Sequence, residues 1–368
     1  MRDWTRISIM SLFILGGAAP GSPEARRPEG TIQLVGRMRI GRAAATVSTI
    51  SNDRVLIAGG MVDGGGALRE FEVFDATTRR VVATGDMGEA RIGHSATTLS
   101  DGRVLILGGF NGSYLKTAEL FDPRTGRFAA AGSMNVGRSG HTATLLGDGS
   151  VLITGGVGDG WSFLSSAEIY DPATGRFTLV KPLSVARESH TATLLRDGRV
   201  MIAGGHRDRR ENIVIYASTE IYDPSQRQFA AGPALTIARH KHEAAALADG
   251  RVLVFGGSDP RDRTRYSSAE VYDPASNRWL AVSPMATARY KLRDTALRLR
   301  DDRILIAGSG RFAEVFDPRT NAFTRVAGEF GQDYSFASAT LLGDGDALVL
   351  GGYDDAMHHT DGIWRFHP

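Results

Sequence analysis

A short apolar run that ends in two glycines recurs about every fifty residues, and this repeat constrains the fold more than any other feature of the sequence. The sixth copy is degraded to Gly-Ser, and the seventh is weak. The seven copies end at Gly60, Gly109, Gly156, Gly205, Gly257, Ser309 and Gly352. Self-similarity at such a period is typical of repeat architectures, in which each unit is one supersecondary element. The chain of 368 residues is therefore predicted to form one repeat domain, although its length alone would suggest about two domains.

Each unit of the repeat is predicted to contain four strands. An alternating stretch such as Gly140–Leu146 comes first, and an Asp-Gly turn such as Asp148-Gly149 leads to the strand that ends in two glycines. Asp-Gly supplies the positive φ angles of a two-residue hairpin. A third strand ends in Tyr/Phe-Asp-Pro, as at Ala167–Pro172, and a short fourth strand such as Gly126–Met134 closes a unit. Four strands in each fifty-residue unit indicate the blades of a β-propeller.

The sequence resembles the kelch family in its double glycine, its Tyr/Phe-Asp-Pro turn, its period and an aromatic residue that follows the turn. The aromatic residues are Phe128, Phe177, Phe229, Trp279 and Phe323. The resemblance covers residues 31–368 and extends to the kelch domains of secreted bacterial proteins and of galactose-oxidase-like propellers. It implies an all-β, seven-bladed kelch-type β-propeller with four-stranded blades. Six blades are the alternative, if the degraded sixth unit packs differently.

The ends of the sequence predict how the ring of blades closes. The repeats span 39–86, 87–133, 134–182, 183–234, 235–284, 285–330 and 331–368. The last repeat lacks a fourth strand, and residues 31–38 resemble one. We therefore expect the N-terminal strand to complete the last blade, which would remove the exposed strand edges that promote aggregation.

The first thirty residues have the pattern of an export signal. Arg2 and Arg6 precede the apolar run Ile7–Ala19, which ends in small residues. This is the pattern of a secretory signal peptide over residues 1–19, and the run is too short for a permanent membrane span. Residues 20–30 are rich in Pro, Gly and charge and are expected to be a flexible leader. The mature protein is then expected in the periplasm or outside the cell, with no stable membrane insertion after cleavage.

Composition excludes several classes of function. Lys and Arg together number 43 and Asp and Glu 41, and this balance argues against a nucleic-acid partner. The sequence contains no Cys, which excludes disulfides, thiolate metal sites and cysteine nucleophiles. Apolar residues at 42% and charged residues at 23% are ordinary for a soluble globular protein.

Two residue types recur in so many units that a structural role explains them best. A glutamate precedes the Tyr/Phe-Asp-Pro turn in six units, whereas acid–base catalysis needs one or two carboxylates. A histidine recurs at one position in four units, as His94, His141, His190 and His242. Metal ligation needs nitrogens about 2.1 Å from one ion, and histidines on four successive blades do not converge in this way. We expect both sets to hold strands and blades together, with no metal site and no cofactor.

A basic residue recurs three positions before this histidine, in the loop that enters the innermost strand. The position is occupied by Arg42, Arg91, Arg138, Arg187, Arg239 and Lys291, with Tyr334 in the last unit. The sixth unit is shifted by two residues, so that Arg289 could fill the position instead. In kelch propellers this loop helps to shape the ligand-binding face, so the resemblance implies a basic ring at one channel mouth. Such a ring would attract anions. The alternative is that each arginine pairs with a local carboxylate and only ties the blades together.

Residues that break the repeat are better candidates for a specific ligand, because symmetry does not explain them. The loops His206–Asn212 and Asp259–Tyr266 are long and charged, and an earlier loop carries Trp161. A mixture of Arg, Tyr, Trp and Asp on one rim is typical of sites for sugars or peptides. We therefore predict that Trp161, Arg209 and Arg263 join the basic ring in binding.

These observations favour a secreted, non-enzymatic binding module with an anionic glycan or a protein as partner, and we expect a monomer. The alternative function is a polysaccharide lyase or sugar epimerase acting on acidic sugars, for which Tyr290, Tyr334 and His206 are the candidate bases. Copper-radical oxidation, which galactose-oxidase-like propellers can perform, is disfavoured. That chemistry uses a Tyr cross-linked to a Cys, and the sequence contains no Cys.

Overall fold

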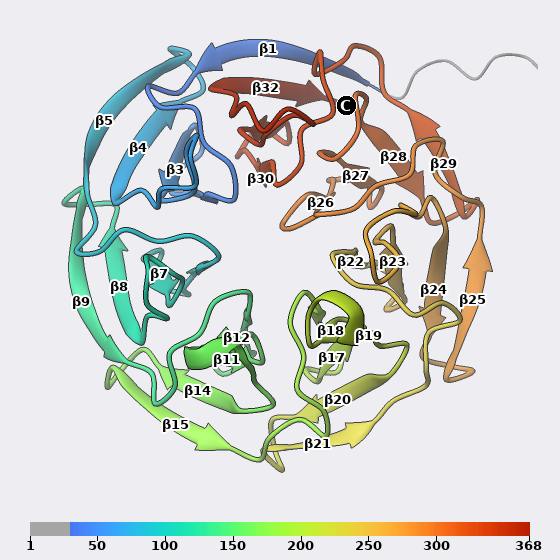
Figure 1. The fold of residues 1–368 in the computed structure, drawn as a ribbon. Helices are drawn as coiled ribbons and strands as arrows, with labels where there is room; N and C mark the ends of the chain where they lie inside the picture. Colours follow the sequence, from blue (N-terminus) through green and yellow to red (C-terminus); the bar gives the residue numbers. More distant parts are fainter. Residues whose placement is uncertain (1–29) are drawn as a thin grey trace, which may run out of the picture.

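The computed structural model describes residues 30–368, so the predicted signal peptide and nearly all of the leader lie outside the described residues. Within the described part, seven four-stranded antiparallel sheets are arranged around a central channel (Figure 1). The predicted all-β, seven-bladed propeller is confirmed, and the six-bladed alternative is wrong. None of the helices in residues 30–368 has the length and apolar character needed to cross a membrane.

The blades are numbered here in chain order, and their strands are given from the channel outward. Blade 1 contains β2 (Thr46–Thr49), β3 (Arg54–Ala58), β4 (Glu70–Asp75) and β5 (Arg80–Asp86). Blade 2 contains β6 (Ser95–Thr98), β7 (Val104–Leu107), β8 (Thr117–Asp122) and β9 (Arg127–Ser133). Blade 3 contains β10 (Thr142–Leu145), β11 (Val151–Thr154), β14 (Ala167–Asp171) and β15 (Arg176–Val180). Blade 4 contains β16 (Thr191–Leu194), β17 (Val200–Ala203), β20 (Thr219–Asp223) and β21 (Gln228–Ala231).

The remaining blades follow the same order. Blade 5 contains β22 (Glu243–Ala246), β23 (Val252–Phe255), β24 (Ala269–Asp273) and β25 (Arg278–Val282). Blade 6 contains β26 (Ala296–Arg298), β27 (Ile304–Ile306), β28 (Glu314–Asp317) and β29 (Ala322–Arg325). Blade 7 contains β30 (Ser338–Leu341), β31 (Ala347–Leu350), β32 (Gly362–His367) and the N-terminal strand β1 (Thr31–Arg37).

The two ends of the described chain close the ring together. Strand β1 pairs antiparallel with β32, with Thr31 opposite His367 and Leu34 opposite Trp364. Figure 1 shows β1 as the outermost strand of blade 7. The prediction that the N-terminal strand completes the last blade is confirmed.

The hydrophobic core lies between neighbouring blades. The second strand of each blade is buried on both faces, so it has a continuous apolar sequence rather than an alternating one. In one such cluster Leu105 and Leu107 of blade 2 pack with Val151 and Ile153 of blade 3. Each blade therefore depends on its neighbours for burial, as expected of a repeat protein.

The double glycines are required where the second strands end. Gly155 and Gly156 have φ angles of 62° and 94°, which side chains rarely adopt. A Cβ atom on Gly155 would lie 2.5 Å from the carbonyl oxygen of Arg187, and one on Gly156 would lie 2.6 Å from that of Ser139. The glycines thus allow the chain entering the next blade to pass close to the end of this one.

Candidate functional site at the channel mouth

The recurrent arginines are buried inside the blades and not exposed at the channel mouth. Arg138 donates from Nη1 to the carbonyl oxygens of Gly155 (2.8 Å) and Ser166 (3.0 Å). Its Nη2 lies 2.8 Å from Oε1 of Glu168, and neither side chain of this pair is exposed. Six arginines have no exposed surface and pair in this way with a glutamate of their own blade: Arg42, Arg91, Arg138, Arg187, Arg239 and Arg289. The prediction that these arginines bind a ligand is therefore wrong, because their donors are used within the blade.

The sixth blade shows why the alignment of this position was ambiguous. Arg289, not Lys291, fills it: Nη1 donates to the carbonyl of Gly308 (2.7 Å), and Nη2 lies 2.9 Å from Glu314. The turn residue Asp249 follows Arg239 by ten positions, but Asp301 follows Arg289 by twelve. Lys291 therefore does not fill the arginine position, and its side chain is free to make a different contact.

The recurrent glutamates and histidines have the structural roles expected of them. Glu168 also accepts hydrogen bonds from the backbone N–H groups of Asn135 and Val136, which lie in the segment that crosses from blade 2 to blade 3. Nε2 of His94 lies 3.0 Å from Oγ1 of Thr46 on the neighbouring blade, and Nε2 of His141 lies 2.9 Å from Oγ of Ser95. Burial, followed by the charge of Arg91, lowers the pKa of His94 to about 3. These histidines are neutral hydrogen-bonding groups between blades.

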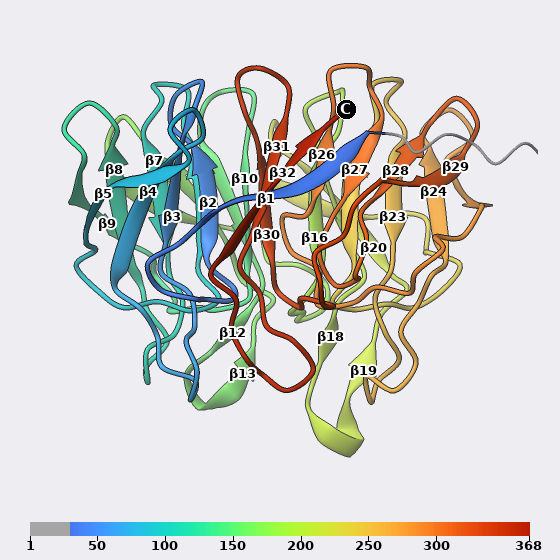
Figure 2. The ribbon, with the colours of Figure 1, turned by 90° about the horizontal axis from the view of Figure 1, so that it is seen from above.

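A hollow of about 1290 Å³ opens at the mouth of the channel on the face that carries the loops after the double glycines. We call it the mouth hollow. Figure 2 shows two small hairpins projecting from this face, β12 (Val157–Gly158) with β13 (Ser162–Phe163) and β18 (His206–Arg207) with β19 (Val214–Ile215). Three of the predicted ligand-binding residues line the mouth hollow: Trp161, Arg209 and Arg263.

The polarity of the mouth differs sharply between blades. On six blades the residue after the arginine position forms a backbone bridge with the residue after the double glycine. The bridges are Ala43–Met61, Ile92–Phe110, Ser139–Val157, Glu188–His206, His240–Ser258 and Ser335–Tyr353. Blades 1 to 3 present mostly apolar side chains at these positions, whereas blades 4 and 5 present a carboxylate, two imidazoles and a hydroxyl. The repeat therefore carries a one-sided polar site.

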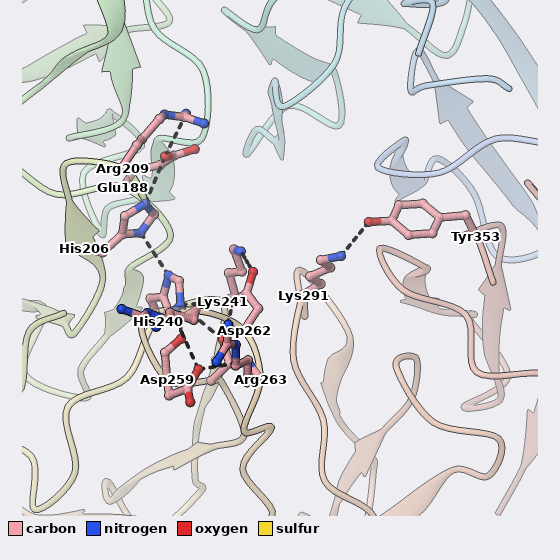
Figure 3. A network of polar contacts seen from close by, with 12 residues as sticks. Glu188, His206, Arg209, His240, Lys241, Asp259, Asp262, Arg263, Lys291 and Tyr353 are labelled. Atoms are coloured by element: carbon pink, nitrogen blue, oxygen red, sulfur yellow. Dashed lines mark hydrogen bonds and ion pairs between the residues drawn. The ribbon is translucent and has the colours of Figure 1, made fainter. Parts of the chain in front are cut away.

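Three of these polar side chains, Glu188, His206 and His240, form a chain with Asp262 that crosses from blade 4 to blade 5 (Figure 3). Oε2 of Glu188 lies 3.5 Å from Nε2 of His206, and Nδ1 of His206 lies 3.1 Å from Nδ1 of His240. Nε2 of His240 lies 3.3 Å from Oδ1 of Asp262 and 3.1 Å from Oγ of Ser258. A contact between two Nδ1 atoms needs one proton between them, so the chain fixes the tautomers of both imidazoles together.

The electrostatics of this chain differ at its two ends. Burial raises the pKa of Glu188, against the opposing charges of Arg209 and Lys241. Burial would also raise the pKa of Asp262, but hydrogen bonds from His240, Lys241 and Ser258 outweigh it and hold this pKa well below its usual value. Burial and the neighbouring His240 lower the pKa of His206 to about 3. The pKa of Asp262 thus lies below that of an exposed aspartate, and Glu188 takes up a proton more readily than an exposed glutamate.

Two lysines lie beside this chain in a strained backbone conformation. Lys241 and Lys291 have φ angles of 53° and 52°, at the position that Gly93 and Gly140 occupy in blades 2 and 3. Lys241 forms an ion pair with Asp262, and Lys291 donates to the hydroxyl of Tyr353 (2.9 Å). A left-handed conformation costs a non-glycine residue roughly 1–2 kcal/mol. Ala44, Ser189 and Phe336 have it at the same position of other blades, so the conformation belongs to the repeat and only the lysine side chains are particular to blades 5 and 6. The sequence contained a signal for these two site residues, because the chain has only four lysines and two of them replace this glycine.

An exposed aromatic platform borders the same site. Trp161 is 56% exposed, and its φ angle of 61° holds the indole away from the blade. The guanidinium of Arg209 lies 4.1 Å from the centre of the Trp161 ring and also lies 3.6 Å from Glu188. Tyr114 meets the indole edge-on at 6.0 Å. The platform is therefore connected to the polar chain through Arg209.

The three candidate bases lie in different surroundings. Tyr334 is partly buried, packs against Trp364 at 5.4 Å beside the core between blades 6 and 7, and does not line the mouth hollow. Tyr290 is 7% exposed and is covered by Arg265 and Lys291. Only His206, of these three, lines the mouth hollow.

The fold, the double glycines and the buried Arg–Glu pairs together define a repeat propeller with a polar site at one channel mouth. The kelch motif matches residues 91–135, 137–184 and 244–286. The chain is thus a seven-bladed β-propeller that carries kelch motifs. Kelch repeats of this kind point to a propeller that binds a partner.

Comparison with other known proteins adds information on the fold. No curated protein matches the chain. Among solved structures, the chain is similar to a fungal alcohol oxidase of the AA5 family in complex with copper. The two are 14% identical over 92% of this chain and 76% of that chain, with a TM-score of 0.72. At this identity the likeness concerns the fold alone.

The residues of this chain do not fit the copper centre that such a neighbour implies. A Tyr cross-linked to a Cys cannot form, because the sequence contains no Cys. Among residues 30–368, no three His, Asp or Glu side chains come together in a way that would hold a metal ion.

Proposed function

We propose that this protein is a binding module that holds an acidic saccharide in the mouth hollow. The observation that carries the proposal is the concentration of charged and polar side chains on blades 4 and 5, at positions where blades 1 to 3 present mostly apolar side chains. A structural need shared by all blades would not produce this asymmetry. A ligand contacted mainly by one side of the mouth would.

The chemistry of the site supports a saccharide with an acidic group. Trp161 offers a broad apolar surface on which a sugar ring can stack, and its edge remains able to form polar contacts. Arg209 and Lys241 offer charge-assisted hydrogen bonds to a carboxylate, and Glu188 and Asp262 can accept hydrogen bonds from sugar hydroxyls. The export signal expected at residues 1–19 supports a further part of the proposal, which is that binding takes place in the periplasm or outside the cell.

A second candidate, acid–base chemistry on the same ligand class, is favoured by one observation. The chain from Glu188 through His206 and His240 to Asp262 can move a proton by exchanging tautomers, with the same number of protons at the start and the end. Glu188 would be the group that meets the ligand. A lyase would then release a product with a new double bond that absorbs ultraviolet light, and a simple binder would not.

The test is calorimetric titration of the purified protein with uronate-containing oligosaccharides and with neutral oligosaccharides of the same length. We expect binding of the acidic series and at least a tenfold loss of affinity for Trp161→Ala and Arg209→Ala. The matched control is Arg124→Ala, because Arg124 is exposed at a turn on the opposite face and pairs only locally with Asp122. Absence of binding to both series would overturn the proposal and direct the search to a protein partner.

A further inference from the structure

Arg293 differs from the six buried arginines described above in both position and pairing. It lies in the two-residue insertion of blade 6, directly before β26. Its Nη2 donates to the carbonyl oxygen of His94 at 2.7 Å. His94 belongs to blade 2, which is not a neighbour of blade 6 in the ring, so the side chain of Arg293 reaches across the channel. Arg293 also lines the mouth hollow.

The guanidinium of Arg293 has few hydrogen-bond and ion-pair partners for a charged group that lines the mouth hollow. Its nearest carboxylate among the described residues is that of Asp294, which lies 3.8 Å from Nε and is 71% exposed. A guanidinium has five N–H donors, and within residues 30–368 one hydrogen bond to protein is found for Arg293. By contrast, Arg138 uses its donors on two carbonyls, a hydroxyl and a buried carboxylate.

The positive charge of Arg293 acts on side chains of four other blades. After burial and the nearer Arg138, it helps to lower the pKa of His141, and it opposes the effect of burial on Glu188 and Glu243. The carboxyl group of Glu243 is itself weakly charged, because burial and the adjacent Asp294 raise its pKa to about 7. A cation at the centre of the hollow is therefore only partly neutralised by the wall around it.

We propose that Arg293 is the anchor for the acidic group of the ligand, and that a carboxylate entering the channel binds the guanidinium and replaces the carbonyl of His94. This inference rests on the proposed function and names the group that would select acidic over neutral saccharides. The planar fork of a guanidinium matches a carboxylate through two parallel hydrogen bonds. Trp161 and Arg209 would hold the rest of the sugar at the rim.

The test compares how strongly each protein variant discriminates acidic from neutral ligands. Uronate oligosaccharides, neutral oligosaccharides of equal length and sodium sulfate are titrated into the wild type, Arg293→Gln, Arg293→Lys and the rim control Arg265→Gln. Arg265 stacks on Tyr290 and pairs with the exposed Asp355. We expect Arg293→Gln to lose at least tenfold in affinity for the acidic series and to bind the neutral series unchanged, with a smaller loss for Arg293→Lys. Arg265→Gln should keep the discrimination of the wild type.

The outcomes separate this inference from the proposed function. If Arg293→Gln is less stable yet still discriminates as the wild type does, Arg293 is only a brace across the channel and the inference fails alone. If the wild type binds neither series, both proposals fail. Stronger binding of sulfate than of uronate would overturn the carboxylate assignment. Should the Arg293 variants not fold, the ¹⁵Nε–¹Hε resonance of Arg293 in the wild type provides the readout. It should shift on addition of the uronate and not of the neutral sugar, and an unmoved resonance would overturn the inference.

Discussion

Arg138 and Glu168 form a fully enclosed ion pair, with Nη2 of the arginine 2.8 Å from Oε1 of the glutamate and no exposed surface on either side chain. The same pair recurs in six blades. The glutamate also holds the segment that enters the blade, so each pair connects the crossover to the sheet that follows it. The recurrent arginine thus stabilises the blade and its crossover segment and does not contact a ligand.

Arg138→Met should destabilise the fold by about 3–5 kcal/mol, because it leaves the carboxylate of Glu168 buried without its counter-ion. Urea unfolding at neutral pH measures this change. The double variant Arg138→Met, Glu168→Leu should recover part of the loss, since it removes the unpaired charge as well. The exposed control Arg124→Met should change the free energy of unfolding by less than about 0.5 kcal/mol. A loss below about 1 kcal/mol for Arg138→Met would contradict the assigned role.

Acidification should destabilise the protein steeply below pH 6.5. Burial lowers the pKa of His94 and His190 to about 3 in the folded state, and it holds those of His141 and His242 well below the ordinary value. The unfolded chain therefore binds more protons than the folded one between these values, and stability falls as pH falls. Each histidine should cost about 1.4 kcal/mol per pH unit in this window. Urea midpoints at pH 7.5, 6 and 5 would check this prediction, which an unchanged midpoint would disprove. His190→Gln should reduce the slope by about one proton.

Lys241→Gly should separate stability from binding. Glycine relieves the left-handed strain of roughly 1–2 kcal/mol, but it loses the ion pair with Asp262 and increases the entropy of the unfolded chain. We expect a free energy of unfolding within about 1 kcal/mol of the wild type, together with a clear loss of affinity for the acidic saccharide. The matched control is Ser189→Gly at the same position on blade 4, where φ is 54°, and it should bind normally. Unchanged affinity in Lys241→Gly would show that Lys241 makes no contact with the ligand.

Glu243→Gln should stabilise the protein at alkaline pH. Burial and Asp294 raise the pKa of Glu243 to about 7 in the folded state, above its ordinary value. The folded state therefore binds the extra proton between pH 4.5 and 7, and its stability falls as pH rises through this window. Removing the ionisable group should raise the free energy of unfolding at pH 8 by about 1–3 kcal/mol and leave it nearly unchanged at pH 5. Urea unfolding of the variant and the wild type at both pH values tests this prediction. A gain in stability over the wild type that is smaller at pH 8 than at pH 5 would refute it.

The fold could be predicted because its determinants are local and repeated. Asp148-Gly149 and Gly155-Gly156 specify a turn and a strand end from their own backbone preferences, and seven copies remove the ambiguity of a single short motif. The structural roles of Glu168 and His94 could be predicted for the same reason, since a need shared by the blades explains a shared residue. The closing strand β1 was also visible, because the last repeat was short of one strand.

The candidate site was harder to predict, because a sequence shows which residues carry charge but not which charges are already paired. Arg138 was expected at the channel mouth. Its guanidinium instead donates to Glu168, thirty residues later in the sequence, and is not available to a ligand. Trp161, Arg209 and Arg263 were singled out because they break the repeat, and all three line the mouth hollow. Lys241 was missed as a ligand candidate, although a lysine at a glycine position was a usable signal.

The sequence by itself determined the repeat, the four strands of each blade and the way in which the ring closes, and it favoured seven blades over six. These properties depend on turn residues, strand periodicity and close backbone approaches that each short segment encodes. Only the tertiary structure decided which side chains face the channel. The chain from Glu188 through His206 and His240 to Asp262 joins loops of two blades, and Arg293 meets His94 across the ring. Contacts of this kind depend on how the blades are placed around one axis, and no local preference of the chain encodes them.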